Sequence, residues 1–143
     1  MAGLENRRAR HDYEILETLE AGLALVGTEV KSLRAGQVDF TGSFARFQGG
    51  ELFLQDFYIA PYEKGGYTNH DPRRRRKLLL HRRELNKLKA QVEQKGLTLV
   101  PLRIYFNERG KAKLLLALAR GKRDYQKKAD DKKRAVQREL EGW

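Results

Sequence analysis

The sequence contains no cysteine, which excludes disulfide bonds and thiolate metal sites. No apolar run approaches the roughly 20 residues that a membrane-spanning helix needs. The first residues also lack the apolar stretch of a secretory signal peptide. We therefore expect a protein of the reducing cytoplasm that does not act at a membrane.

Histidine is scarce, and its three positions, His11, His70 and His81, show no spacing typical of a metal site. The four aspartates before residue 120 do not form the spaced acidic set that would hold Mg²⁺. No glycine-rich phosphate loop precedes a helix. The sequence therefore predicts no metal, no cofactor and no catalytic residue. The alternative left open is a metal-independent ribonuclease that uses one of the histidines.

Positive charge is abundant. The 143 residues include 30 lysines and arginines against 19 aspartates and glutamates, a formal net charge of +11. This surplus repels itself in a compact protein unless a polyanion neutralises it. A hydrophobic content of 40% is enough for a folded core. With a membrane disfavoured, the composition indicates a globular domain that binds nucleic acid.

The hydrophobic pattern predicts many short strands with two helices between them. A strand from Tyr13, a kink near Ala21 and Gly22, and a second strand come first. The other predicted elements are a helix over 28–35 capped by Thr28 and Gly36, a hairpin with strands at 44–47 and 52–59, a loop over 61–72, a strand over 78–80, a helix over 82–95 ended by Gly96, and a hairpin with strands at 102–106 and 111–119. The predicted fold class is mainly β with flanking helices. An OB-like closed antiparallel barrel is favoured over a sandwich.

The domain boundary is predicted at residue 120, with a body over 1–120 and a basic tail over 121–143. The only large aliphatic residues of the tail are Val136 and Leu140. Its (i, i+4) charge pairs contribute only about 0.2–0.5 kcal/mol each, so the tail is expected to be frayed or disordered when free. A segment that folds on an RNA surface is the functional alternative.

The densest charge lies between Arg73 and Lys89, where nine cations accompany one acid, Glu84. A solvated face normally mixes charges of both signs, and this stretch does not. Because the arginine fork matches phosphate oxygens, the run predicts contact with a nucleic-acid backbone rather than sequence readout. The nearby Tyr58, Tyr62 and Tyr67 could stack on unpaired bases or anchor the loop.

Several stretches of the sequence resemble the small protein B family, also called SsrA-binding proteins. The matching stretches follow the family order and span essentially the whole chain. They are residues 6–11 with Tyr13, 20–25, 27–36, 76–81, 95–102 and 118–123. The Glu-Val-Lys-Ser-Leu-Arg block at 29–34 and the Leu-Ala-Arg-Gly-Lys block at 118–122 are specific in combination.

The resemblance implies an OB-like barrel that binds the tRNA-like domain of transfer-messenger RNA. The tail is then expected to enter the empty mRNA channel of a stalled ribosome near the small-subunit decoding centre, where it becomes helical. The RNA supplies the alanine and the reading frame for a degradation tag, and the protein catalyses nothing. We expect a monomer in a one-to-one complex with the RNA.

Position by position, the resemblance implies two groups of site residues. The RNA-binding group on the body comprises Arg7, Arg8, Arg10, Glu20, Lys31, Arg34, Arg73, Arg74, Arg75, Arg76, Lys77, Leu79, His81 and Lys113. The group that contacts the ribosome comprises Gly121, Lys122, Arg123, Tyr125, Lys127 and Lys128. The chain departs from the family at Gln126, where an acid is usual, so a role for that carboxylate is in doubt.

Overall fold

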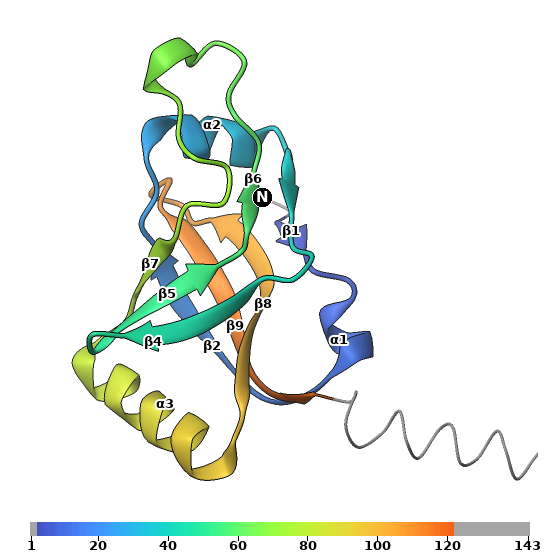
Figure 1. Ribbon diagram of the computed structural model, residues 1–143, viewed down its shortest axis with the longest axis vertical. Helices are drawn as coiled ribbons and strands as arrows, with labels where there is room; N and C mark the ends of the chain where they lie inside the picture. Colours follow the sequence, from blue (N-terminus) through green and yellow to red (C-terminus); the bar gives the residue numbers. More distant parts are fainter. Residues whose placement is uncertain (1–2, 122–143) are drawn as a thin grey trace, which may run out of the picture.

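The computed structural model describes residues 3–121, and within this range the chain is mainly β with three α-helices (Figure 1). The ten other regular elements described are nine strands and one short 3₁₀ helix. The elements are β1 (Leu4–Glu5), α1 (Ala9–Asp12), β2 (Tyr13–Leu23), α2 (Gly27–Arg34), β3 (Val38–Asp39), β4 (Phe44–Gln48), β5 (Glu51–Gln55), β6 (Tyr58–Ile59), η1 (Gly66–Thr68), β7 (Arg76–Leu79), α3 (Arg82–Lys95), β8 (Thr98–Phe106) and β9 (Ala112–Gly121).

The main sheet closes on itself. Its strand order is β1-β8-β4-β5-β7-β2-β9, and β8 also pairs with β9, so six strands form a ring from which β1 branches. Every described pairing is antiparallel, and β3 and β6 form a separate two-stranded ribbon. The predicted mainly β fold with flanking helices is confirmed, and its strands close as expected for an OB-like barrel.

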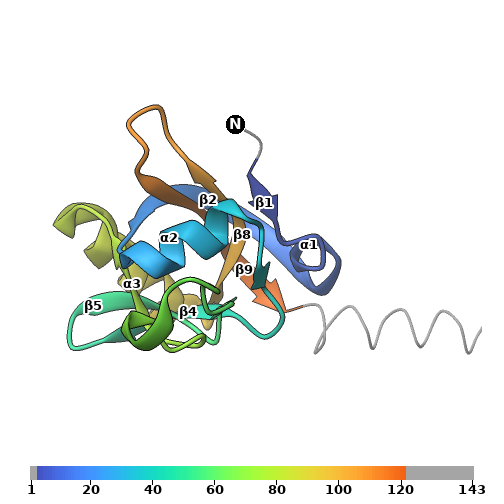
Figure 2. The same ribbon diagram turned by 90° about the horizontal axis from the view of Figure 1, so that it is seen from above.

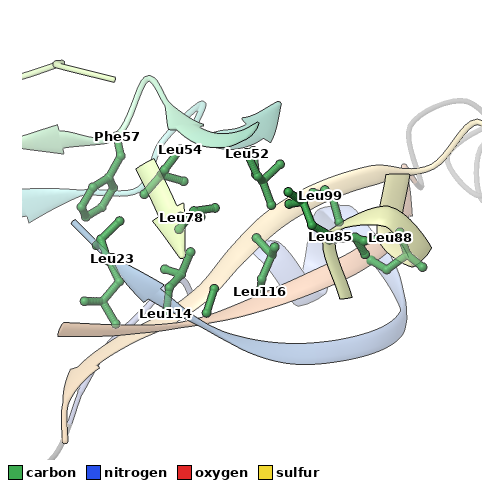
Figure 3. Close-up of a cluster of buried hydrophobic side chains, with 14 of the residues drawn as sticks. Leu23, Leu52, Leu54, Phe57, Leu78, Leu85, Leu88, Leu99, Leu114 and Leu116 are labelled. Carbon is green, nitrogen blue, oxygen red and sulfur yellow. The ribbon is translucent and has the colours of Figure 1, made fainter. Parts of the chain in front are cut away.

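Leucines from all sides of the ring fill its interior (Figure 3). Leu52, Leu54, Leu114 and Leu116 have no exposed surface, because alternate side chains of each strand point inward. One end of the ring is covered by α3, which contributes Leu85 and Leu88 to the core, and the other end by α2 (Figure 1). The helix predicted over 82–95 is confirmed, and Gly96 ends it in the left-handed conformation at φ 61°.

The outer surface of β8 and β9 carries a second, smaller apolar cluster. Ala9 of α1 packs there against Val100, Leu102, Ala117 and Ala119, all of them buried. The N-terminal residues therefore form β1 and α1 against the sheet, two elements that the hydrophobic pattern did not predict. Arg7, Arg8 and Arg10 lie around this small helix and are exposed.

Two local predictions at the first strand and helix were wrong in detail. The kink predicted near Ala21 and Gly22 is absent, because β2 runs unbroken to Leu23 and its pairing with β9 shifts register between Ile15 and Glu17 instead. Helix α2 begins at Gly27, one residue earlier than predicted, so Thr28 is not its N-cap. The Gly49–Gly50 hairpin turn is confirmed, but the strand predicted over 52–59 divides into β5 and β6, because Asp56 takes a left-handed φ of 54° and β6 pairs with β3 instead. The 61–72 loop is confirmed and contains the short helix η1.

Candidate RNA interface

Strand β7 divides the basic run between the inside and the outside of the protein. Arg76 and Leu78 are buried, whereas Lys77 and Leu79 are exposed, as the two-residue period of a strand requires. The sequence predicted that Arg76 contacts RNA, and this is corrected: its side chain has no exposed surface. Arg76 therefore cannot meet a phosphate in this conformation.

The partner of Arg76 is Glu29 of α2, which is also fully buried. One Glu29 oxygen accepts from the Arg76 Nε at 2.5 Å, and the other accepts from the Arg74 Nη2 at 2.5 Å. The backbone N–H of Val26 adds a third donor at 3.0 Å, which satisfies the start of α2 in place of the predicted Thr28 cap. Arg76 also donates to the carbonyl oxygens of Phe57 and, at 3.1 Å, of Pro72.

These contacts determine the charge of the buried pair. Burial by itself raises the pKa of Glu29, but hydrogen bonds from Arg74 and Val26 and the charge of Arg76 outweigh burial and lower that pKa. Burial lowers the pKa of Arg76, and the carboxylate of Glu29 opposes this change. We therefore describe an ionised, hydrogen-bonded pair that fastens β7 to α2.

Glu29 had no predicted role, although it lies in the block that matches the family. An acid in a helix with two nearby cations usually indicates an exposed ion pair. Only the tertiary structure shows that Glu29 contacts Arg74 and Arg76, which lie 45 and 47 residues later in the chain.

His70 is a structural residue of the same region. It is 9% exposed, its Nε2 lies 2.9 Å from the Ile59 carbonyl, and its Nδ1 lies 2.8 Å from the Thr28 hydroxyl. A neutral imidazole satisfies both bonds by donating from Nε2 and accepting at Nδ1. His11 is exposed beside Asp12, and His81 is exposed at the start of α3. The three histidines thus lie in three separate settings.

Three of the predicted RNA-binding residues lie together on the outer surface of the sheet. In the strand register, Gly22 of β2 is opposite both Leu79 and Lys113, and Lys113 is opposite Tyr105. Glu20 lies two residues along β2 on the same side, and it accepts a hydrogen bond from the Tyr105 hydroxyl. We call Glu20, Leu79, Tyr105 and Lys113 the β2–β9 face.

Leu79 is the unusual member of this face, because half of this apolar side chain is exposed to water. Gly22 provides the space for it: a Cβ at Gly22 would lie 3.1 Å from the Leu79 Cβ, tighter than ordinary contact. Gly22 therefore allows Leu79 to lie directly over β2. His81 follows Leu79 by two residues and is exposed at the same edge.

Two cations of α2, Lys31 and Arg34, each lie against an aromatic ring. The Arg34 guanidinium stacks 4.1 Å from the ring centre of Phe106, next to Tyr105. The Lys31 ammonium lies 5.4 Å from the ring centre of Tyr62. Tyr62 is thus partly covered and anchored in its loop, whereas Tyr67 is fully exposed at the loop tip.

Three other cations of the basic run, Arg73, Arg75 and Lys77, lie beside residues of the β4–β5 hairpin and β6. Arg75 stacks 3.9 Å from the ring centre of Phe53 and donates to Gln48. Lys77 lies 3.6 Å from Glu51. Arg73 lies 5.5 Å from the ring centre of Tyr58, so Tyr58 already has a cation over it. Because β7 pairs with both β5 and β2, this group adjoins the β2–β9 face.

Of the predicted ribosome-contacting residues, only Gly121 is described. It belongs to β9 and is paired with Tyr13, so it is part of the folded body rather than of the predicted tail. The other five tail residues, and the prediction of tail disorder and helix formation, lie outside the described residues.

Residues 3–121 contain no group of three or more His, Cys, Asp or Glu side chains that could hold a metal ion. In the same range, no helix has both the length and the apolar character needed to cross a membrane.

An SsrA-binding protein of Thermus thermophilus is 75% identical over 138 residues, covering 96% of each chain. One of Moorella thermoacetica is 58% identical over 136 residues, covering 95% of this chain and 88% of the relative. A solved chain described as "tmRNA-SmpB: a journey to the center of the bacterial ribosome" superposes with a TM-score of 0.75 at 74% identity, covering 96% of each chain. The family model described as SmpB protein matches residues 3–142. This chain belongs to the SmpB protein family.

Proposed function

We propose that this protein binds the tRNA-like domain of transfer-messenger RNA and delivers it to stalled ribosomes. There the RNA tags the nascent chain and the ribosome is rescued. The observation that carries the proposal is 75% identity with an SsrA-binding protein over 96% of both chains. The solved relative is itself described with transfer-messenger RNA and the bacterial ribosome.

The β2–β9 face supports this proposal as the centre of the RNA-binding surface. Lys113 supplies charge for phosphate, and Leu79 supplies an apolar contact for a base or ribose. The Tyr105 hydrogen bond holds Glu20, whose carboxylate can accept from the amino groups of bases. The surrounding exposed residues would extend the surface: Arg7, Arg8, Arg10, Lys31, Arg34, Arg73, Arg75, Lys77 and His81, together with the half-buried Arg74.

The segment after Gly121 is proposed to contact the ribosome. Its Lys122, Arg123, Lys127 and Lys128 supply charge for ribosomal RNA at the decoding centre and in the mRNA channel. Tyr125 would stack on a base there. Gly121 itself is paired in β9, so we place the start of this segment at residue 122.

In this proposal the protein is a binding factor without catalytic residues, metal or cofactor. It works in the cytoplasm, where bacterial ribosomes are, as a monomer bound one-to-one to the RNA. The buried, hydrogen-bonded His70 supports a non-catalytic role for that histidine. Incubation with structured RNA should leave the RNA intact. Cleavage that disappears when one histidine is replaced would favour a ribonuclease.

The deciding experiment reconstitutes translation on an mRNA without a stop codon, with transfer-messenger RNA present. Adding the full chain should produce tagged nascent chains, and omitting it should abolish tagging. Removing residues 122–143 should abolish tagging while RNA affinity stays nearly intact. Loss of RNA binding in the shortened chain would contradict the proposed division between body and tail.

A further inference from the structure

A pocket lies between the C-terminal end of α2 and the turn that joins β8 to β9. Figure 2 shows α2 across the ring and the β8–β9 hairpin projecting past it. The pocket is lined by Arg34, Tyr105, Phe106 and the turn residues 107–110. We call it the turn pocket. It combines a cation, aromatic side chains and a polar backbone turn within one concave surface.

Arg34 presents its guanidinium to the turn pocket in a fixed orientation. One face of the guanidinium stacks on Phe106, 4.1 Å from the ring centre, and Phe106 is itself 9% exposed. A Cβ at Gly110 would lie 3.8 Å from the Arg34 Nη2, which places the turn beside the guanidinium edge. An arginine held on one face by an aromatic ring can stack a base on its other face.

The turn itself is held by hydrogen bonds within it. The Asn107 side-chain oxygen accepts from the backbone N–H of Arg109 at 3.0 Å and of Lys111 at 2.9 Å. The Gly110 N–H donates to the Asn107 carbonyl at 2.9 Å, and Gly110 takes the left-handed φ of 74°. The wall of the turn pocket is therefore formed before a ligand arrives, which reduces the ordering cost of binding.

Charge favours an anionic ligand in the turn pocket. Arg34, Arg109 and Lys111 are exposed, and none of them forms a salt bridge within residues 3–121. Glu108 is the single acid that lines the pocket. A phosphate can pair with these cations, and a planar base can stack beside the aromatic rings.

The turn pocket is continuous with the β2–β9 face. Tyr105 lines the pocket and also donates its hydroxyl proton to Glu20, and it is opposite Lys113 in the strand register. A nucleic acid strand that contacts Lys113 can therefore reach the pocket without leaving the protein surface.

We propose that the turn pocket binds one unpaired nucleotide of the transfer-messenger RNA. Its base stacks on the free face of the Arg34 guanidinium, and its phosphate pairs with Arg109. This inference rests on the proposed function and adds a nucleotide subsite to it. Phe106 positions Arg34 rather than contacting the RNA itself.

The test uses full-length protein and transfer-messenger RNA, with affinity measured by filter binding and nucleotide reactivity by chemical probing. Arg34→Lys keeps the charge and removes the planar stacking surface, so affinity should fall about tenfold, the effect of losing one stacked base. The salt dependence of binding should stay near that of the wild type. In the wild-type complex one unpaired nucleotide should be protected, and the variant should lose that protection alone.

Arg109→Gln is a second variant, because this side chain is exposed and its loss should leave the fold intact. It should lower affinity about threefold and reduce the salt slope by roughly one phosphate contact. Arg46→Lys, the same change at an exposed arginine of β4 that belongs to neither the basic run nor the predicted RNA-binding residues, is the matched control and should change nothing. Thermal unfolding of each variant should match the wild type.

Three results would overturn the inference. One is full affinity and an unchanged probing pattern in both pocket variants. Another is a pattern altered only on ribosomal RNA in the ribosome-bound complex, which would assign the pocket to a different RNA. A third is an affinity loss in the Arg46→Lys control as large as the loss in Arg34→Lys. If the wild-type protein failed to bind transfer-messenger RNA at all, the proposed function would fail first and independently.

Discussion

Adjacent residues of β7 have opposite environments. Arg76 is fully buried against Glu29, whereas Lys77 is exposed beside Glu51 at 3.6 Å. In the sequence both belong to one uniform basic run. The first fastens the barrel to α2 through charge-assisted hydrogen bonds, and the second is available to an external anion.

The difference shows that a basic run is not one functional unit. Removing a charge from water costs several kcal/mol unless its hydrogen bonds are replaced. Arg76 meets this requirement with one carboxylate and three backbone carbonyls within 3.5 Å. Leu79 shows the converse, because an apolar side chain stays half exposed on the β2–β9 face. In β7, the buried cation Arg76 is a structural anchor, and the exposed apolar residue Leu79 belongs to a candidate contact surface.

The largest effect is expected at the anchor. Arg76→Met should lower the free energy of unfolding by about 3–5 kcal/mol, because Glu29 would keep a buried charge without its main partner. Urea denaturation of the full chain measures this change. Lys77→Met is the matched control and should stay within about 0.5 kcal/mol of the wild type. Equal losses of stability in the two variants would contradict the assignment of Arg76 to the interior and of Lys77 to the surface.

The pH dependence of Glu29→Gln sharpens the same contrast. At pH 7 this variant should lose roughly 1.5–3 kcal/mol of stability, the range for hydrogen bonds to a charged group. The pKa of Glu29 is lower in the folded protein than its ordinary value of 4.5. Its contribution is therefore present above pH 4.5 and is lost as the pH falls through the folded pKa. The gap between wild type and variant should narrow in acid, and a constant gap would contradict an ionised Glu29.

A smaller effect is expected on the exposed side, and it concerns binding rather than folding. Leu79→Ala should weaken transfer-messenger RNA binding by about 1–2 kcal/mol while stability changes little, because half of the leucine is already in water. Leu16→Ala is the control, since Leu16 is 41% exposed and lies outside the β2–β9 face. An equal change in RNA affinity for both variants would exclude Leu79 as a contact.

The smallest effect should come from a single charge of the face. Lys113→Gln should weaken RNA binding by about 0.5–1 kcal/mol at moderate salt. The slope of log K against log salt should fall by roughly 0.7–0.9, the contribution of one phosphate. Titrations at several salt concentrations measure both quantities. An unchanged slope would place Lys113 away from the phosphate backbone.

The sequence pattern correctly predicted those elements whose conformation depends only on their own residues. The helix over 82–95 and its Gly96 end follow from apolar spacing and from a glycine that accepts a left-handed φ. The Gly49–Gly50 turn follows in the same way, since both glycines have positive φ. The N-terminal elements were not predicted, because Ala9 is buried only by a surface of β8 and β9, which lie much later in the sequence.

In the candidate site, too, single residues were predictable from the sequence, whereas their arrangement was not. The resemblance named Glu20, Leu79 and Lys113 separately, and strand register then showed that they share one face. It named Arg76 with its neighbours and could not show that a strand turns it inward. Tyr105 and the turn pocket were missed, because a tyrosine in an alternating strand gives no sign of which acid it will meet.

By itself, the sequence determined the charge, the mainly β character, the two longer helices and the family. Each of these depends on composition, on spacing within one element, or on short matching blocks. Only the tertiary structure decided which cations are buried, which acid neutralises them, and which outward residues lie side by side. The physical reason is that burial and pairing are set by contacts between residues far apart in the chain, such as Glu29 with Arg76 and Gly22 with both Leu79 and Lys113.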